Sequence, residues 1–158
     1  MTFVAIIFFA FNSLAMEQYK ETDFVGKTAP EFSLKDINGD TINSSEFLGK
    51  KPVVIFFWAT WCPHCRTAIK HLNDIYPELK AKGAELITID LGEKANRVTG
   101  YLKTYNYNLI TLLDENSTTV DSYGVVGVPT FFILNSQGTI KFKGHALPED
   151  YISLLFKD

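Results

Sequence analysis

The stretch of sequence that decides the fold is residues 52–65, which read PVVIFFWATWCPHC. Its first seven residues, 52–58, are apolar throughout and rich in β-branched and aromatic side chains. A run of this kind is typical of a central β-strand that is covered on both faces. The two cysteines of the chain, Cys62 and Cys65, follow soon after it. They therefore lie where a buried strand passes into the next element.

The residues after the cysteines predict a helix. Apolar side chains recur at helical spacing from Ala68 to Leu79, and Gly83 marks the end of the pattern. Pro77, inside the pattern, predicts a kink or a break. Pro63 suits the first turn of this helix, because the N–H that proline lacks has no partner there. The free N–H groups and partial positive charge of the helix start would stabilise a thiolate at Cys62.

The spacing of the cysteine pair favours redox chemistry over a structural role. A loop of two residues removes little entropy from the unfolded chain, so this pair would be a poor structural staple. We expect Cys62 to be the exposed nucleophile and Cys65, one turn into the helix, to resolve the mixed disulfide. His64 can donate a hydrogen bond or a positive charge to the Cys62 thiolate, which would make the disulfide more oxidising. The alternatives are a structural disulfide, a pair of buried thiols, and a His64 that is only an exposed polar residue.

Two thiolates at this spacing could also supply half of a tetrahedral metal site. Nothing else in the sequence completes such a site, since there is no second cysteine pair and His71 and His145 are isolated. We therefore expect neither a structural metal nor a cofactor. Transient copper binding stays open.

Composition and patterning indicate one packed domain of the α/β class. The chain has 158 residues, of which 46% are hydrophobic and 21% charged. Its net charge of -3 is scattered without a basic stripe, so nucleic-acid binding is not expected. Strands and helices alternate first and a hairpin comes last, which predicts a mixed central sheet flanked by helices. Beyond the first strand and helix, we expect strands at 31–34, 85–90, 109–113, 130–134 and 139–143, and helices around 98–105, at 118–123 and from 148 onward. Asn38-Gly39 predicts a hairpin turn after the strand at 31–34.

The first residues indicate export. Residues 3–11 form an apolar run that is too short to span a bilayer, and Ser13 with Ala15 fits the small-x-small pattern of a signal-peptide cleavage site. No Lys or Arg precedes the run, so an uncleaved anchor or an incorrectly chosen start codon are the alternatives. We expect residues 1–15 to be a signal peptide or membrane anchor and residues 24–158 to be the folded domain. The domain would then lie outside the cytoplasm, with membrane contact only through the N-terminal segment if it stays uncleaved.

Two separate motifs carry a resemblance to a known family. Residues 57–65, FWATWCPHC, resemble the active-site segment of the thioredoxin superfamily, and residues 127–130, GVPT, resemble its second signature, a cis-proline loop. The lead-in 26–34, the hairpin after it and the added segment between Asp90 and Tyr123 are similar to the extracytoplasmic TlpA/ResA branch. The resemblance spans about residues 24 to 156.

This resemblance implies a thioredoxin-like fold with an N-terminal hairpin and an inserted αβ segment. Cys62 would attack, Cys65 would resolve, and Pro129 would lie in cis beside them. Trp61, Val128 and Pro129 would contact the substrate, whose chain could pair with the Val128 backbone as an added strand. Without the cysteine motif, Pro129 would be taken for an ordinary turn proline.

The sequence departs from the family pattern at two positions. Many members of this branch carry a glutamate three positions after the second cysteine, where this chain has Ala68. The buried acid of cytoplasmic thioredoxins would fall at Phe56, which is apolar. Proton handling must therefore differ from both patterns, through water or His64. The Pro-His dipeptide is similar to that of DsbA-type oxidants, whereas the scaffold resembles reductants of cytochrome c maturation, so the direction of electron flow stays open.

The leading hypothesis is an exported thiol–disulfide oxidoreductase that exchanges disulfides with protein cysteines and is recycled by a separate redox partner. One alternative is a DsbA-like oxidant. Another is a peroxiredoxin-type peroxidase, since Thr60, Trp61 and Cys62 form a Thr-x-Cys triplet, although Arg66 is misplaced for that chemistry. The last is a copper-handling module.

Overall fold

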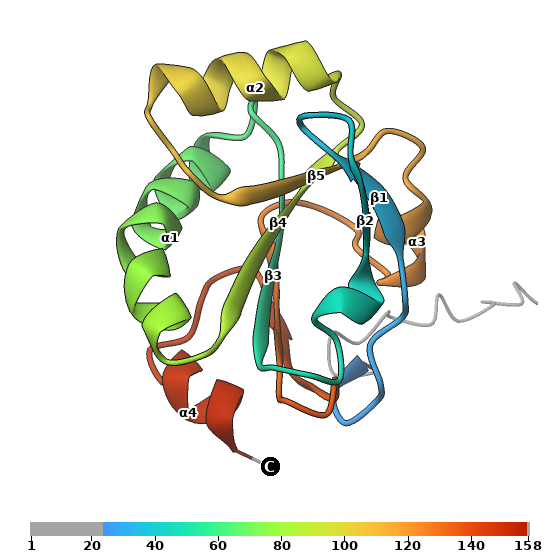
Figure 1. Cartoon of the computed structure of the whole chain (residues 1–158), viewed down its shortest axis with the longest axis vertical. Coiled ribbons are helices and arrows are strands. Elements are labelled where there is room, and N and C mark those ends of the chain that lie inside the picture. Colours follow the sequence, from blue (N-terminus) through green and yellow to red (C-terminus); the bar gives the residue numbers. More distant parts are fainter. Residues whose placement is uncertain (1–23, 158) are drawn as a thin grey trace, which may run out of the picture.

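The computed structural model describes residues 24–157, so the predicted export segment 1–15 lies outside the described residues. Within that range, seven strands form one mixed sheet in the order β2-β1-β5-β4-β3-β6-β7 (Figure 1). The strands are β1 Ser33–Asp36, β2 Thr41–Asn43, β3 Val53–Trp58, β4 Glu85–Leu91, β5 Ile110–Asp114, β6 Thr130–Leu134 and β7 Ile140–Gly144. The helices are η2 Ser44–Glu46, α1 Pro63–Ala81, α2 Ala95–Thr104, α3 Thr118–Ser122 and α4 Tyr151–Phe156. The predicted fold class, with its N-terminal hairpin and inserted αβ segment, is confirmed.

Strand β3 lies inside the sheet, as its sequence predicts. It runs parallel to β4 and antiparallel to β6, and all six of its residues are fully buried. At its end, Trp58 lies opposite Asp90 of β4, and Phe57 lies opposite Thr130 of β6. Because β6 is antiparallel to β3, the start of β6 lies beside the end of β3. This topology brings the cysteine motif and the Pro129 loop to one edge of the sheet.

The side chains of β3 alternate between two hydrophobic layers. Val54, Phe56 and Trp58 pack on the side of α1, α2 and α4. The residues between them pack on the opposite side, against the lead-in segment and α3. Figure 1 shows α1 and α2 on one side of the sheet and α3 on the other. The sheet is therefore covered on both faces, which accounts for the continuous apolar character of β3.

Helix α1 runs without a break through Pro77, so of the predicted kink or break, the break is wrong. A proline inside a helix removes one backbone hydrogen bond and costs about 3 kcal/mol. The buried face of α1 offsets this cost, since Ile69, Leu72 and Leu79 are at most 1% exposed. Each such side chain contributes roughly 1.5–3 kcal/mol on burial. Packing against the sheet therefore outweighs the local effect of the proline.

The N-terminal hairpin forms where Asn38-Gly39 predicts it. The Asp36 carboxylate accepts hydrogen bonds from the N–H groups of Asn38 and Asp40, and Gly39 takes a φ of +97°, which only glycine adopts readily. Strand β1 begins two residues later than the predicted 31–34. It does so because its ladder is set by pairing with β2 and with β5, where Lys35 lies opposite Leu113.

Candidate active site

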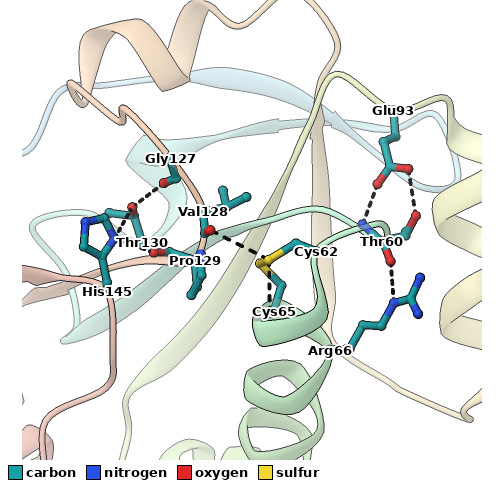
Figure 2. The surroundings of a disulfide bond; sticks show 10 residues. All are labelled: Thr60, Cys62, Cys65, Arg66, Glu93, Gly127, Val128, Pro129, Thr130 and His145. Carbon is teal, nitrogen blue, oxygen red and sulfur yellow. Dashed lines mark hydrogen bonds between the residues drawn. A yellow bond between two sulfur atoms is a disulfide. The ribbon is translucent and has the colours of Figure 1, made fainter.

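Cys62 and Cys65 form a disulfide at the N-terminal end of α1 (Figure 2). Cys62 is the N-cap residue of this helix, with extended backbone, and Pro63 takes the first helical position. The Cys65 backbone N–H donates a hydrogen bond to Cys62 Sγ at 3.2 Å. This N–H has no partner inside the helix, so it is free to stabilise negative charge on the sulfur. The strand-to-helix placement predicted for the pair is confirmed.

The predicted exposure of Cys62 is wrong in degree. Cys62 is 4% exposed and Cys65 is fully buried, so Cys62 is the more accessible sulfur but only slightly. The Pro129 loop lies against it, with the Val128 carbonyl oxygen 3.7 Å from Cys62 Sγ. The sequence could not indicate this cover, because the loop comes from a distant part of the chain.

The Val128–Pro129 peptide bond is cis, as the family resemblance implied. Two side chains hold the loop on its far side from the disulfide (Figure 2). The Thr130 hydroxyl donates to the Gly127 carbonyl at 2.6 Å. His145 Nδ1 lies 2.7 Å from the Pro129 carbonyl oxygen, so this nitrogen carries the proton and donates. His145 thereby has a place beside the site that the sequence did not reveal.

A groove with a volume of about 540 Å³ opens beside the redox pair and the cis-proline. Helix α1 supplies one wall and the segments around β6 and β7 supply the other. The lining residues are His64, Thr67, Ala68, His71, Leu72, Pro129, Phe131, His145, Ala146 and Leu147. All three histidines of the chain line this groove, a shared location that the sequence did not indicate. Within residues 24–157, however, no three His, Cys, Asp or Glu side chains converge in a way that could hold a metal ion.

The segment just ahead of Cys62 is fixed by side chains from helices α1 and α2 and from the loop that follows β4. The Thr60 N–H donates to Glu93 Oε2 at 2.5 Å, and the Thr60 hydroxyl donates to Glu93 Oε1 at 2.7 Å. Arg66, on α1, donates from Nε to the Thr60 carbonyl at 2.7 Å (Figure 2). Arg97, on α2, pairs with Glu93 at 2.6 Å. Every polar group of Thr60 is therefore engaged, two residues before the N-terminal cysteine.

A buried carboxylic acid lies behind this segment. Asp90, at the end region of β4, is fully buried. Burial raises its pKa to about 8, and a hydrogen bond with Glu93 and the charge of Glu93 act in the same direction. Sequence reasoning looked for a buried acid at Phe56, which instead stacks on Phe131 with ring centroids 4.6 Å apart. The sequence feature that could have revealed Asp90 as the buried acid is its position at the carboxyl end of a strand parallel to β3.

A family model described as the AhpC/TSA family matches residues 25–143, which is well over half of the chain. The chain belongs to the AhpC/TSA family. ResA of Bacillus thuringiensis subsp. konkukian strain 97-27, a thiol-disulfide oxidoreductase, is 33% identical over 135 residues, covering 84% of this chain and 78% of ResA. ResA of Bacillus subtilis strain 168 is 34% identical over 121 residues, covering 77% of this chain and 67% of that ResA.

Solved structures agree with this assignment. A Chlorobium tepidum protein assigned as a thiol:disulfide interchange protein DsbE superposes with a TM-score of 0.72 at 29% identity, covering 82% of this chain and 92% of that one. A secreted Mycobacterium tuberculosis disulfide oxidoreductase shares the fold, with a TM-score of 0.66 at 22% identity, over 75% and 84% of the two chains. This AhpC/TSA family member is a ResA-like thiol–disulfide oxidoreductase.

Proposed function

We propose that the chain is an exported protein-disulfide reductase. The environment of Cys62 Sγ is the observation that supports electron flow from this pair to the substrate. Cys62 is almost buried, and its Sγ faces the Val128 carbonyl oxygen at 3.7 Å. Burial and a facing carbonyl oxygen both disfavour negative charge on the sulfur. A less stable thiolate makes the reduced pair less stable, so the pair gives up its electrons more readily.

The proposed reaction uses the two cysteines in order. The Cys62 thiolate attacks one sulfur of a substrate disulfide, that disulfide breaks, and the released substrate thiolate takes up a proton. The Cys65 thiolate then attacks Cys62 Sγ, which releases the second substrate thiolate and leaves the Cys62–Cys65 disulfide that the structure contains. Two electrons and two protons have then moved from the pair to the substrate. A separate reductant must restore the dithiol before the next cycle.

The substrate chain is proposed to lie across the cis-proline loop and the groove. Trp61 is 57% exposed, directly before Cys62, which suits it to contact a protein partner. The Val128 backbone lies beside Cys62 Sγ, where a substrate segment could pair with it as an added strand. Pro63 fixes the helix start below the sulfur, and Pro129 holds the Val128 backbone in place.

A DsbA-like oxidant is the second candidate, and one observation favours it. The Cys65 N–H donates to Cys62 Sγ at the helix start, an interaction that stabilises a thiolate. His64 is exposed on the same first turn, and we propose that its imidazole adds to this stabilisation. The two candidates differ in which effect on the Cys62 thiolate is larger. A larger stabilisation by the helix start favours the oxidant, and a larger destabilisation by burial against Val128 favours the reductase.

A peroxidase of the peroxiredoxin type finds less support in the site. The Thr60 hydroxyl donates to Glu93 and accepts from Arg97 Nε at 3.1 Å. It is therefore committed to these two side chains rather than to a peroxide at Cys62. Peroxide consumption by the reduced protein, and copper binding that depends on both cysteines, are the measurements that would favour the peroxidase or the copper-handling alternative.

For the location, we propose that residues 1–15 direct the folded domain, 24–158, out of the cytoplasm. None of the helices within residues 24–157 is long and apolar enough to cross a membrane. If it stays uncleaved, the N-terminal segment is proposed to be the point of membrane contact.

Trapping of mixed disulfides tests the proposed function. The full chain carrying Cys65→Ser is expected to accumulate partner proteins on Cys62 in the exported fraction, and the trapped species should dissolve on reduction. Cys62→Ser is the matched control and should trap none. Trapping by Cys62→Ser alone would reverse the roles of the two cysteines, and a reduced protein that fails to reduce insulin disulfides would contradict the proposed reductase.

A further inference from the structure

Two buried acidic residues, Asp90 and Glu93, lie behind the active-site segment. Asp90 Oδ1 accepts a hydrogen bond from the Glu93 backbone N–H at 3.1 Å. Asp90 Oδ2 is buried and has no hydrogen-bond donor among the described residues. A buried oxygen in this position costs free energy as an unpaired acceptor. Asp90 Oδ2 gains a hydrogen bond if it carries a proton and donates that proton to a neighbouring acceptor.

The neighbouring carboxyl group is that of Glu93, whose backbone N–H already bonds Asp90 and whose charge acts on it. Two buried carboxyl groups that interact in this way cannot both be ionised at low cost. Glu93 has the Arg97 guanidinium as its ion-pair partner and accepts two hydrogen bonds from Thr60. Because these groups all donate to Glu93, Asp90 is the member of the pair that holds the proton. The raised pKa of Asp90, about 8, agrees with this assignment.

We propose that Asp90 and Glu93 are positioning residues for Cys62: the Asp90 carboxyl donates a hydrogen bond that orients Glu93, and Glu93 fixes Thr60 through its N–H and hydroxyl groups. Neither carboxyl is assigned contact with the reacting sulfur atoms. The pair acts through Thr60, whose position sets where the next turn presents Trp61 and Cys62. This role rests on the thiol–disulfide exchange proposed above, and it holds for either direction of electron flow.

A pH dependence follows from the pairing. The charged and titratable groups around Asp90 are Glu93, after β4, and Arg97, on α2. Across from them, Arg66 of α1 bonds Thr60, and Tyr101 of α2 packs on Trp58 with ring centroids 5.6 Å apart. When Asp90 loses its proton, two adjacent carboxylates share a single arginine and repel each other. Glu93 then holds Thr60 less well, so Cys62 reacts more slowly above about pH 8, where a larger thiolate fraction alone would make it faster.

The test measures two properties of the whole reduced protein between about pH 5 and about pH 10. One is the infrared carbonyl band of a protonated carboxylic acid, which wild type should show at neutral pH and lose through a transition near pH 8. The other is the rate at which Cys62 reacts with a small aromatic disulfide. We expect the wild-type rate to fall above that transition, whereas Asp90→Asn, which keeps an N–H donor at every pH, should continue to rise.

Two further variants complete the test. Glu93→Gln offers one carbonyl oxygen in place of two carboxylate oxygens, so the rate should fall roughly tenfold at neutral pH, the effect of losing one hydrogen bond to a charged group. Asp114→Asn is the matched control, since Asp114 is a buried acid at the end of the neighbouring strand β5 that bonds the Val120 N–H in α3. Its rate profile should match wild type.

Three results would overturn the proposal. The first is wild type without the protonated-acid band at neutral pH, a measurement that needs no variant to fold. The second is an Asp90→Asn profile that falls above pH 8 as wild type does, and the third is a Glu93→Gln rate equal to wild type. A small disulfide reports on Cys62 whatever the protein substrate, so these failures are distinguishable from a failure to reduce insulin.

Discussion

Replacing Asp90 with asparagine is expected to change how the free energy of unfolding depends on pH. Burial, together with the neighbouring Glu93, raises the pKa of Asp90 from its ordinary value of 3.8 to about 8. Below about pH 4 the folded and unfolded states both hold this proton. Between about pH 4 and pH 8 the unfolded chain has released it and the folded chain keeps it. Wild type therefore loses stability as pH rises through this window, and a residue that does not titrate removes that loss.

The magnitude follows from the same two pKa values. At pH 7 the unfolded state gains about 4 kcal/mol by ionising Asp90 while the folded state gains almost nothing. The stability of Asp90→Asn relative to wild type should therefore increase by about 4 kcal/mol from pH 4 to pH 7 and level off above pH 8. This is a large effect beside the 5–15 kcal/mol by which domains are typically stable.

Urea denaturation of the oxidised proteins, at intervals of about one pH unit, measures this difference. Comparing two proteins at each pH cancels the titration of groups that do not interact with Asp90. Asp114→Asn, compared with wild type in the same way, is the control for loss of a buried carboxyl elsewhere in the sheet. A difference between Asp90→Asn and wild type that stays constant from pH 4 to pH 8 would refute the assignment of a protonated buried Asp90.

Three other substitutions test the account of the site and its core. Trp61→Ala should lower kcat/KM for insulin roughly tenfold and leave the rate with a small disulfide unchanged, because the exposed indole is proposed to contact only a protein substrate; equal losses with both substrates would argue against that role. Phe131→Ala should lower the free energy of unfolding by about 3–5 kcal/mol in urea, since the ring is 2% exposed and stacks on Phe56. His64→Ala should make the redox couple more reducing in a glutathione equilibrium, because the thiolate loses a neighbouring imidazole; an unchanged potential would mean that the helix start acts on Cys62 alone.

Local patterns predicted the elements that depend on local physics. The apolar run of β3 and the helical spacing of α1 appear in the structure where the sequence indicates them. The Asn38-Gly39 turn does too, because its φ requirement is a property of those two residues. The cis Val128–Pro129 bond followed from family resemblance, since a proline in a loop gives no local signal of its isomer.

The features that were missed depend on contacts between distant segments. The low exposure of Cys62 arises from Val128, which lies 66 residues later in the chain. The continuity of α1 through Pro77 reflects packing on the sheet, which outweighs the local preference of proline. The role of Asp90 and Glu93 beside the site depends on the pairing of β3 with β4. This pairing places Asp90 opposite Trp58, at the edge of the sheet where the redox pair lies. The shared groove of the three histidines likewise depends on how α1 packs beside β6 and β7.

The reduction potential of the Cys62–Cys65 couple tests the central claim most directly. Equilibration of the whole protein with glutathione buffers at neutral pH, read out by the fraction of Cys62–Cys65 disulfide, gives this value. A sulfur that is nearly buried and faces the Val128 carbonyl predicts a reducing couple, near roughly -270 mV as in thioredoxin. A value near roughly -120 mV, as in strong oxidants, would contradict the proposed reductase and assign the chain to disulfide formation.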